Sequence, residues 1–447
     1  MTKQNPMAYK PIFPLLISMA FPPMISMLIQ SLYNIVDSVF VARLGEEALT
    51  AVSLIFPLQN LSIAVSVGIG VAMNAFIARA LGQHNEKEAS FIATQGMVMS
   101  ILHSLIFIII GLFFIKPFVA MFTQNQTVYE YALQYGIIVI TFTFGSFIHI
   151  AIEKMFQATG NMLIPMLMQI FGAVINIILD PILIFGYFGL PALGVIGAAL
   201  ATIIGQFGAC FLSIYLFKRH SEHIHISFKN FKLDLSVFQK LYSIAIPSSV
   251  MLCLPSLLVS LLNGMLASIS QTAVAFFGIY FKLQTFIYMP ANGVIQGMRP
   301  ILSYNYGANH TKRMNQTLKV SGLTIFIILL LGTMSFFIFP EFILAFFNAS
   351  DEMLKIGIPG LRILSLSFVF STFGILMSGT FEALAKGKES LVISLLRQFI
   401  ITIPLAFILL HNIGLIGVWY SFVLAEAIAS IVSILLYINV YKKMSIS

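Results

Sequence analysis

The sequence predicts an all-α integral membrane protein with twelve transmembrane helices arranged as two six-helix repeats. Three observations support this prediction. The 447 residues are 59% hydrophobic and only 9% charged, with a mean hydropathy of +0.97, which is too apolar for a chain that presents a polar shell to water. The apolar stretches are long enough for helical spans and lack the alternation of a β-barrel. Distinctive residues also recur at a constant distance along the chain.

Hydropathy places the twelve helices between mostly short loops. A window of about nineteen residues predicts spans at 13–42, 47–80, 91–115, 127–153, 162–188, 191–217, 237–267, 273–305, 317–340, 353–384, 389–411 and 413–441. A polar, basic and His-rich stretch separates the sixth span from the seventh. We therefore expect an N-terminal lobe at 1–217, a linker at 218–236 and a C-terminal lobe at 237–447. The linker histidines lack the regular spacing of metal ligands, so we expect a solvated segment.

The two halves are related by an internal repeat. An offset of 225 places Pro22 on Pro247, Gly68 on Gly293, Met73 on Met298, Gly82 on Gly307 and Phe156 on Phe381. After one deletion, an offset of 220 places Gly194 and Gly197 on Gly414 and Gly417. Each copy has an even number of spans, so the copies share one orientation and are related by an axis along the membrane normal. Such transporters have a cleft between the copies.

The basic residues predict the topology. They gather on the side of the membrane that carries the chain ends, where Lys3 and Lys443 lie, whereas the opposite side receives only Arg43, Lys116 and Lys355. The positive-inside rule then places both termini in the cytoplasm of a multi-pass cell-membrane protein. Because topology accounts for the net charge of +8, the charge gives no reason to expect a nucleic-acid partner.

Two acids lie inside predicted spans of the N-terminal half. Asp37 ends a polar stripe in the first span, and Asp180 ends another in the fifth. An ionised acid in hydrocarbon costs several kcal/mol unless it is protonated, paired or wetted, so such acids indicate function. Their repeat counterparts are Leu262 and Leu405. The helical spacing puts these polar residues on one face of each helix: Ser26, Gln30, Asn34 and Asp37 in the first, and Gln169, Asn176 and Asp180 in the fifth.

Tyr135 of the fourth span and Thr202 of the sixth lie at a depth similar to that of the two acids. Two carboxylates, an amide, a hydroxyl and a phenol at one level suit either a bound proton or a dehydrated sodium ion held by oxygens. The alternative is that polar side chains only join helices, which fits Asn34, Gln169 and Gln206 equally well. Four other charged residues lie in or beside C-terminal spans, where an ion pair between unassigned partners is one interpretation and a structural role is favoured for Arg299: Lys282, Arg299, Arg397 and Glu426.

These motifs resemble the multidrug and toxic compound extrusion (MATE) transporters over essentially the full chain. The resemblance is carried by Pro22 with Asp37 fifteen residues later, Asn176-x3-Asp180, and GxxGAAxAT ending in Thr202. It is also carried by the paired FQATG and FEALAKGK ends and by GVIQGMRPILSYNYGAN. The family resemblance implies a cation site in the N-terminal lobe at the positions matching Asp37, Asn176, Asp180, Thr202 and Tyr135. It also implies a bend in the first helix at Pro22.

One departure from the family pattern limits what the resemblance implies. The branch that resembles the neisserial and vibrio sodium pumps has acids in its seventh and tenth spans. Here the seventh span has none, and Glu382 lies only at the inner end of the tenth. The resemblance therefore does not extend to an ion site in the C-terminal lobe.

Residues and resemblance together predict an antiporter that exports hydrophobic, commonly cationic, compounds in exchange for H+ or Na+. Na+ would bind at Asp37, Asn176, Asp180 and Thr202. The drug cleft would include Gln30, Asn34, Gln169 and Gln206. The chain lacks Walker A, HExxH and GxSxG sequences, so we expect no enzyme and no cofactor.

Two alternatives stay open at this stage. A lipid-linked precursor flippase of the same superfamily would need several basic residues in its cleft, where this chain offers few. A channel or membrane-anchored receptor is the other class, and the absence of a large extramembrane domain argues against a receptor. As partners we expect drug-like small molecules and membrane lipids, with the protein acting as a monomer.

Overall fold

The structure is a computed structural model that describes residues 5–229, 231–347 and 349–446, with side chains described up to residue 442. Lys3 and the side chain of Lys443, which contributed to the predicted topology, lie outside these limits. Within them, all regular structure is helical. The elements are α1 (Pro6–Tyr9), α2 (Ile12–Ala42), α3 (Glu46–Gly82), α4 (Glu86–Ile109), η1 (Ile110–Phe114), α5 (Ile115–Phe122), α6 (Gln126–Thr141), α7 (Phe144–Ala158), α8 (Leu163–Phe185), η2 (Tyr187–Gly189), α9 (Val195–His220), α10 (Leu235–Ala267), α11 (Gln271–Gly307), α12 (Thr311–Ile338), α13 (Pro340–Ala345), α14 (Asp351–Ala383), α15 (Gly387–Leu395), η3 (Leu396–Ile400), α16 (Thr402–Ile413) and α17 (Leu415–Ile446).

The helices confirm the predicted fold class. In the described residues, 11 helices are long and apolar enough to cross a membrane, or up to 12 when the bent pair α6 and α7 counts as one span. Two predicted spans need correction. The span expected at 91–115 continues without a break through the π-helical turn η1 to Phe122. The span expected at 127–153 is broken at residues 142–143, where α6 and α7 meet at 42°.

Local packing explains the break between α6 and α7. The Thr143 hydroxyl donates back to the Ile140 carbonyl at 3.1 Å, so the side chain competes with the helical backbone there. Two residues later Gly145 leaves room for the Phe207 ring, which lies only 3.3 Å from the position that a Cβ on residue 145 would take. Hydropathy detects neither feature, because both depend on packing.

The turns that join the helices repeat with the offsets seen in the sequence. His84 and Asn309, which correspond at an offset of 225, both have a left-handed backbone, with φ of 57° and 56°. Gly160 and Ala385, at the same offset, share a left-handed turn with φ of 88° and 60°. Each of these turns is closed by a pair of backbone hydrogen bonds in the same register. The duplication therefore extends to backbone conformation.

The chain forms two compact units. The N-terminal unit contains the residues up to Tyr9 and Phe21–Ser249, and the C-terminal unit contains Lys10–Ala20 and the residues from Val250 onward. The described part of the linker 218–236 therefore belongs to the N-terminal unit. One boundary crosses α2 between Ala20 and Phe21, one residue before Pro22, and the other crosses α10 shortly after Pro247, the repeat counterpart of Pro22.

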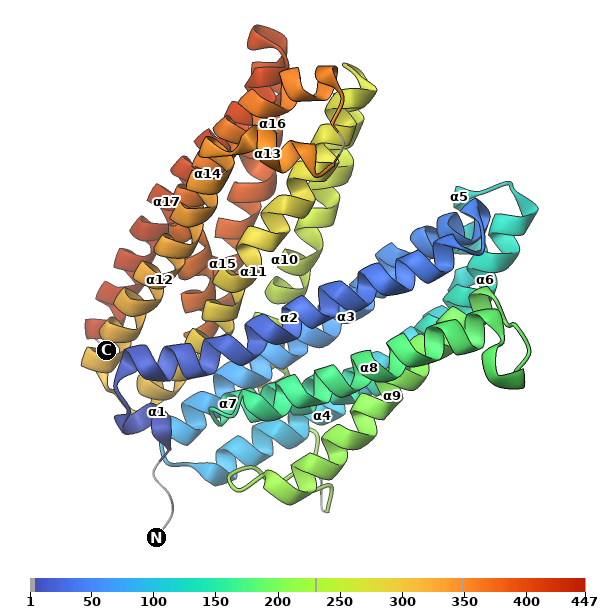
Figure 1. Ribbon diagram of the computed structural model, residues 1–447. Helices are drawn as coiled ribbons and strands as arrows, with labels where there is room; N and C mark the ends of the chain where they lie inside the picture. The colour runs from blue at the N-terminus through green and yellow to red at the C-terminus, as the bar shows by residue number, and fades with distance from the viewer. Residues whose placement is uncertain (1–4, 230, 348, 447) are drawn as a thin grey trace. The chain divides into compact units, whose positions relative to one another are not determined.

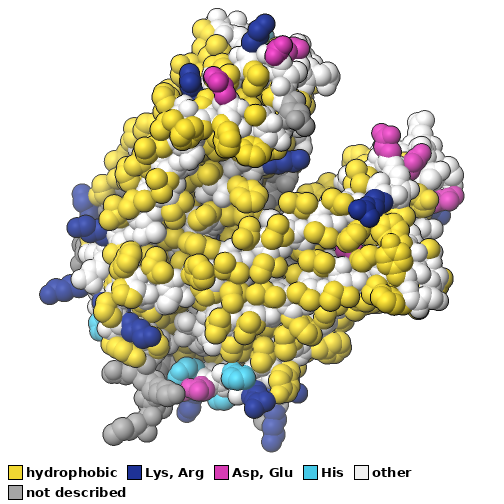
Figure 2. Space-filling model, in the orientation of Figure 1, with side chains coloured by type: hydrophobic (Ala, Val, Ile, Leu, Met, Phe, Trp, Pro, Cys, Tyr) yellow, Lys and Arg dark blue, Asp and Glu magenta, His cyan; other side chains and the backbone are white. Residues whose placement is uncertain are grey.

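Each unit is held together by its own set of helix contacts. In the N-terminal unit α3 packs against α4, α6 and α7, while α8 and α9 lie side by side (Figure 1). In the C-terminal unit α14 packs against α11, α12 and α17. The core of the C-terminal unit is aromatic, with Trp419 stacked on Phe277 at a centroid distance of 6.2 Å. Hydrophobic side chains cover most of the face of the N-terminal unit drawn in Figure 2, as expected for a surface in contact with lipid.

Candidate cation site in the N-terminal unit

The two acids predicted from the sequence meet in the structure. Asp37 comes from α2 and Asp180 from α8, and their carboxyl groups lie within hydrogen-bonding reach of each other. Asp180 has no exposed surface. Carboxylates cannot donate hydrogen bonds, so a bond between the two side chains requires a proton on one of them. The folded chain thus brings two acids, distant in sequence, to one buried point.

Four buried oxygen atoms at this point have no donor in the described residues. They are Oδ1 of Asp37, both carboxylate oxygens of Asp180 and Oδ1 of Asn176. Two ionised carboxylates in contact repel each other, and burial removes the water that would solvate them. An N–H or O–H donor from a neighbouring side chain would offset that cost, and the described part of the chain supplies none to these atoms. A bound proton or metal cation would provide the positive charge that offsets this cost.

Three further predicted residues complete the cluster. The Asn176 side-chain amide donates to the Thr202 hydroxyl of α9 at 3.5 Å. This bond uses the amide nitrogen, so the side-chain oxygen of Asn176 is not engaged by it. Tyr135 of α6 lies within hydrogen-bonding reach of the same hydroxyl. Asn176, Thr202 and Tyr135 are all buried. The structure thus gathers Asp37, Asn176, Asp180, Thr202 and Tyr135, whereas their cation binding stays a prediction.

One residue near the acids was not predicted from the sequence. Tyr33 lies one helical turn before Asp37 on α2 and interacts electrostatically with both carboxyl groups. The signal was available in principle, because residues four apart lie on the same face of a helix.

Close packing of α8 against α9 positions this cluster. A Cβ on Gly172 would lie 3.1 Å from the Gly205 carbonyl oxygen, and a Cβ on Gly205 would lie 2.8 Å from the Gly172 carbonyl oxygen. The two backbones therefore approach more closely than any larger residue would allow. This approach brings Asn176 of α8 within reach of Thr202 of α9.

Of the four predicted drug-cleft residues, two bond to each other, one bonds to Ser146, which was not predicted, and one is exposed. Gln169 donates to Gln30 at 3.2 Å, and Ser146 donates to Gln206 at 3.0 Å. Both pairs join different helices, which agrees with the alternative that such amides link helices. Asn34 is exposed. Their contact with a substrate stays a prediction.

The donor set fits a hard cation. Carboxylate, amide and hydroxyl oxygens are the groups that bind hard cations such as Na+. The four orphaned oxygens are the atoms on which such an ion, or a proton, would depend. The backbone adds one further oxygen without a helical hydrogen bond, which is the Ile177 carbonyl, because Pro181 lacks the N–H that would bond it.

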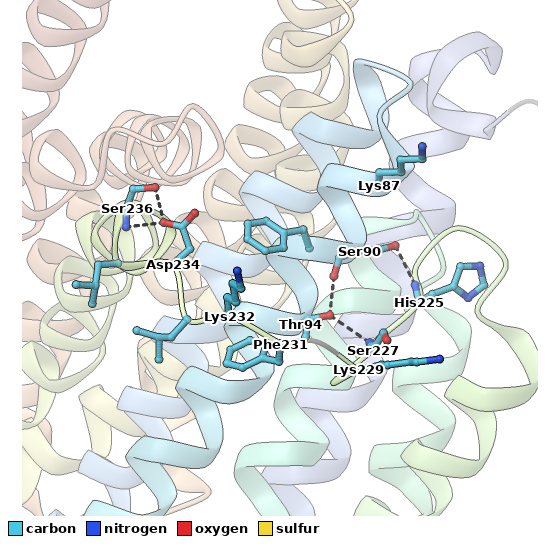
Figure 3. Close-up of a pocket in the computed structure, with 13 residues that line it drawn as sticks. Lys87, Ser90, Thr94, His225, Ser227, Lys229, Phe231, Lys232, Asp234 and Ser236 are labelled. Carbon is cyan, nitrogen blue, oxygen red and sulfur yellow. Dashed lines mark hydrogen bonds between the residues drawn. The ribbon is translucent and has the colours of Figure 1, made fainter.

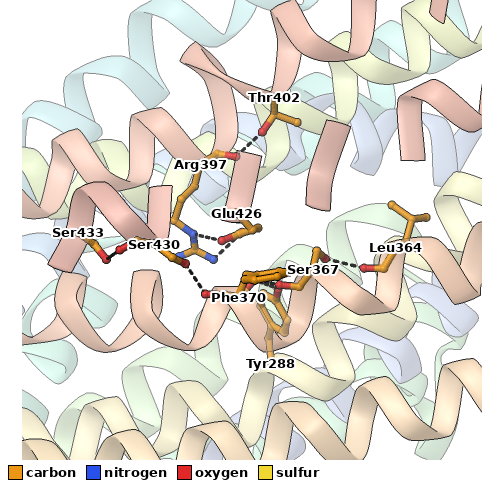
Figure 4. Close-up of polar contacts among 10 residues, drawn as sticks. Tyr288, Leu364, Ser367, Phe370, Arg397, Thr402, Glu426, Ser430 and Ser433 are labelled. Atoms are coloured by element: carbon orange, nitrogen blue, oxygen red, sulfur yellow. Dashed lines mark hydrogen bonds and ion pairs between the residues drawn. The ribbon is translucent and has the colours of Figure 1, made fainter. Parts of the chain in front are cut away.

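The C-terminal unit holds no such pair of acids at the matching positions, which are Leu262 and Leu405. It contains a buried ion pair instead: Arg397 donates to both carboxylate oxygens of Glu426, each at 2.8 Å (Figure 4). Gly374 makes room for this arginine, because a Cβ there would lie 2.7 Å from Arg397 Cδ. Both charges of this pair are therefore satisfied within the protein, unlike those of the two acids in the N-terminal unit.

A second ion pair lies nearer the end of a repeat. Arg299 of α11 contacts Glu382 of α14, a partner that the sequence did not predict. These contacts identify ion-pair partners for three of the four charged residues, which are Arg299, Arg397 and Glu426. In the N-terminal unit, Lys154 Nζ contacts Glu153 Oε1 at 2.7 Å. Each of these acids is balanced by a basic side chain and needs no bound cation.

The predicted hinge at Pro22 lies within a continuous helix. The helix α2 runs from Ile12 to Ala42 through both Pro22 and Pro23. Both prolines are buried, and each removes one backbone donor from the helix. A weakened point at this place is consistent with the crossing of α2 from one unit to the other directly before Pro22, while bending there stays a prediction.

Comparison with known proteins gives consistent results. A family model described as MatE matches residues 22–182 and 247–408. The multidrug export protein MepA of Staphylococcus aureus (strain MSSA476) is 27% identical over 430 residues, covering 95% of this chain and 93% of that protein. MepA of Staphylococcus haemolyticus is 26% identical and covers 97% and 95%.

Solved structures agree with these relatives. A MOP superfamily transporter from Pyrococcus furiosus superposes with a TM-score of 0.89 at 25% identity, covering 98% of this chain and 97% of that one. A structure described as MATE in the bent conformation superposes with a TM-score of 0.92 at 24% identity and covers all of both chains. Because the structure in the bent conformation is only 24% identical, its similarity to this chain supports the fold alone.

Proposed function

The chain belongs to the MatE family of multidrug and toxic compound extrusion transporters, and we propose that it exports hydrophobic, commonly cationic, organic compounds in exchange for H+ or Na+ bound at Asp37 and Asp180. The relatives of similar length named multidrug export protein support drug-like molecules as the substrates. The buried acid pair supports the exchange mechanism.

The observation that carries this proposal is the set of four buried oxygens without a donor among the described residues. A purely structural polar cluster would be expected to satisfy its members, as the Arg397 and Glu426 pair does. The acid pair is instead complete only when it holds a positive charge. Holding and releasing that charge is the task of an ion-coupled transporter.

The coupling cycle follows from the electrostatics of the pair. With a proton or Na+ bound, the carboxyl groups of Asp37 and Asp180 are neutralised and α2 packs closely against α8. When the ion leaves, repulsion between the carboxylates and their need for water favour a different packing of α2. Pro22 provides a point at which α2 bends with little loss of backbone hydrogen bonding. A conformational equilibrium that depends on the bound ion follows.

Reciprocity fixes the relation between drug and ion. If ion binding favours the conformation that releases drug to the outside, drug binding must weaken ion binding by the same factor. Ions that enter down their gradient from outside then drive drug outward. Outward movement of drug requires both termini to lie on the cytoplasmic side of the cell membrane, as the distribution of basic residues predicts.

The test uses purified protein reconstituted into liposomes that contain a fluorescent cationic dye. An imposed Na+ gradient and, separately, a pH jump should each be applied without ATP. Dye movement driven by one of these gradients is expected, and the responsive gradient identifies the coupling ion. Dye movement that persists with neither gradient would indicate a channel. Movement of a lipid-linked precursor in place of dye would indicate the flippase.

A further inference from the structure

A solvent-open pocket of about 800 Å³ lies in the N-terminal unit, formed by the linker and the beginning of α4. Neither acid of the pair lines it. The pocket is lined by Lys87, Ser90, Phe91, Thr94, His225, Ser227, Lys229, Phe231, Lys232, Leu233, Asp234, Leu235 and Ser236 (Figure 3). Its volume lies in the range that holds small organic ligands.

Hydrogen bonds hold the linker against α4 and so give the pocket a defined shape. The backbone N–H of His225 donates to the Ser90 hydroxyl at 3.0 Å, and that of Ser227 donates to Thr94 at 3.4 Å. Further along, the Gln95 side chain donates to the Lys232 carbonyl at 2.7 Å. A linker expected to be merely solvated is therefore fixed along one face of a helix.

The pocket has an excess of positive charge. Three lysines line it, which are Lys87, Lys229 and Lys232, and all three are exposed. No ion pair among the described residues joins any of them to a carboxylate. The one acid in the lining, Asp234, accepts hydrogen bonds from Ser236 and from the start of α10. These bonds hold the pKa of Asp234 below its usual range, so the acid stays ionised while it caps the helix.

Apolar side chains flank the lysines. Phe91, Leu233 and Leu235 line the same pocket and are exposed. The pocket also lies at the N-terminal ends of α4 and α10, which are both candidate membrane spans, and thus near the boundary between membrane and water. Cations beside an apolar wall at this level match a phosphate head group attached to acyl chains. Inorganic phosphate has no apolar part that could pack against this wall.

We propose that this pocket binds the phosphate group of an anionic phospholipid through Lys87, Lys229 and Lys232, with Phe91 and Leu233 against its apolar part. Bound lipid would fix the linker to α4 and to the start of α10. The proposal does not depend on the coupling ion or on the exported compound.

The experiment measures lipid retention by the full-length protein, using native mass spectrometry after detergent extraction. Wild type is incubated with phosphatidylglycerol or with phosphatidylcholine, and in a third arm with phosphatidylglycerol and excess inorganic phosphate. The variant combines Lys87→Gln, Lys229→Gln and Lys232→Gln. The matched control combines Lys312→Gln, Lys386→Gln and Lys388→Gln, three lysines that are also exposed and lie in the C-terminal unit.

We expect wild type and control to retain phosphatidylglycerol in preference to phosphatidylcholine. The pocket variant should retain phosphatidylglycerol at least about tenfold less, since each lysine near an anionic head group contributes to binding. Equal retention by wild type and pocket variant would overturn the proposal. Displacement of the lipid by the excess inorganic phosphate would also overturn it, because the site would then belong to free phosphate. If the triple variant fails to fold, Lys232→Gln alone repeats the comparison.

Discussion

Neutralising Asp180 tests the role of the acid pair. Asp180→Asn keeps the size of the side chain but removes one of the two buried negative charges. The new amide group can donate to the Asp37 carboxyl, which lies within hydrogen-bonding reach. The site would then hold a satisfied carboxylate and would have less need of a cation.

The size of the effect follows from Coulomb's law. A cation about 4 Å from a carboxylate gains about 4 kcal/mol at an effective dielectric constant of about 20. Losing that interaction weakens ion binding by roughly a thousandfold. Gradient-driven efflux should therefore cease at ordinary concentrations of the coupling ion, while folding is preserved because no buried group loses its partner.

The assay is dye efflux from proteoliposomes under the gradient that drives wild type. Leu405→Met is the matched control, because Leu405 occupies the position of Asp180 in the C-terminal repeat. The control should transport normally, and thermal unfolding should show that both variants fold. Normal efflux by the Asp180→Asn protein would refute the placement of the ion in the N-terminal unit.

Three further predictions concern other features of the molecule. Gly205→Ala should reduce efflux by separating α8 from α9, since its Cβ would lie 2.8 Å from the Gly172 carbonyl oxygen. The control Gly264→Ala should transport normally, because a Cβ there meets no atom within 4 Å. Glu426→Ala should lower the free energy of unfolding by about 3–5 kcal/mol, because it leaves the Arg397 charge buried without a partner. Replacing Arg397 by Leu in the same protein should recover most of this loss, and thermal unfolding of the single and double variants measures both effects. The lowered pKa of Asp234 means that its cap stabilises α10 above the ordinary value of 3.8 and is lost as pH falls through the lowered pKa. The protection factor of the Ser236 amide, which compares its exchange rate with the intrinsic rate at the same pH, should then fall as pH falls in wild type but stay constant in Asp234→Asn. Equal acid sensitivity of the two proteins would argue against the cap.

The sequence predicted the helices and their duplication well because both depend on local patterns. Long apolar stretches define spans without reference to neighbours, and the matching turns around His84 and Asn309 each lie two residues after a glycine that the repeat keeps, Gly82 and Gly307. The acids were also predictable. A charge in an apolar span is conspicuous, and helical spacing shows which polar side chains share its face.

Other features depend on packing between segments that are distant in sequence, and they could not be predicted from the sequence. The break between α6 and α7 requires knowledge of Phe207, more than sixty residues away along the chain. The partner of Glu382 is Arg299, although Lys386 is closer in sequence. The linker looked like a solvated segment because its hydrogen-bond partners, Ser90 and Thr94, lie on another helix. In each case hydropathy gives the depth of a residue but does not identify its neighbour.

Coupling between the ion and the drug is tested most directly through Asp37. The measurement is the equilibrium affinity of the purified protein for a fluorescent cationic drug, taken across a range of Na+ concentrations at fixed pH and across a range of pH without Na+. Wild type should bind the drug more weakly as the coupling ion rises, since the two ligands favour different conformations. Asp37→Asn should bind the drug with an affinity that does not depend on either ion. Full ion dependence in the Asp37→Asn protein would contradict the proposed coupling site and would make Asp37 a packing residue.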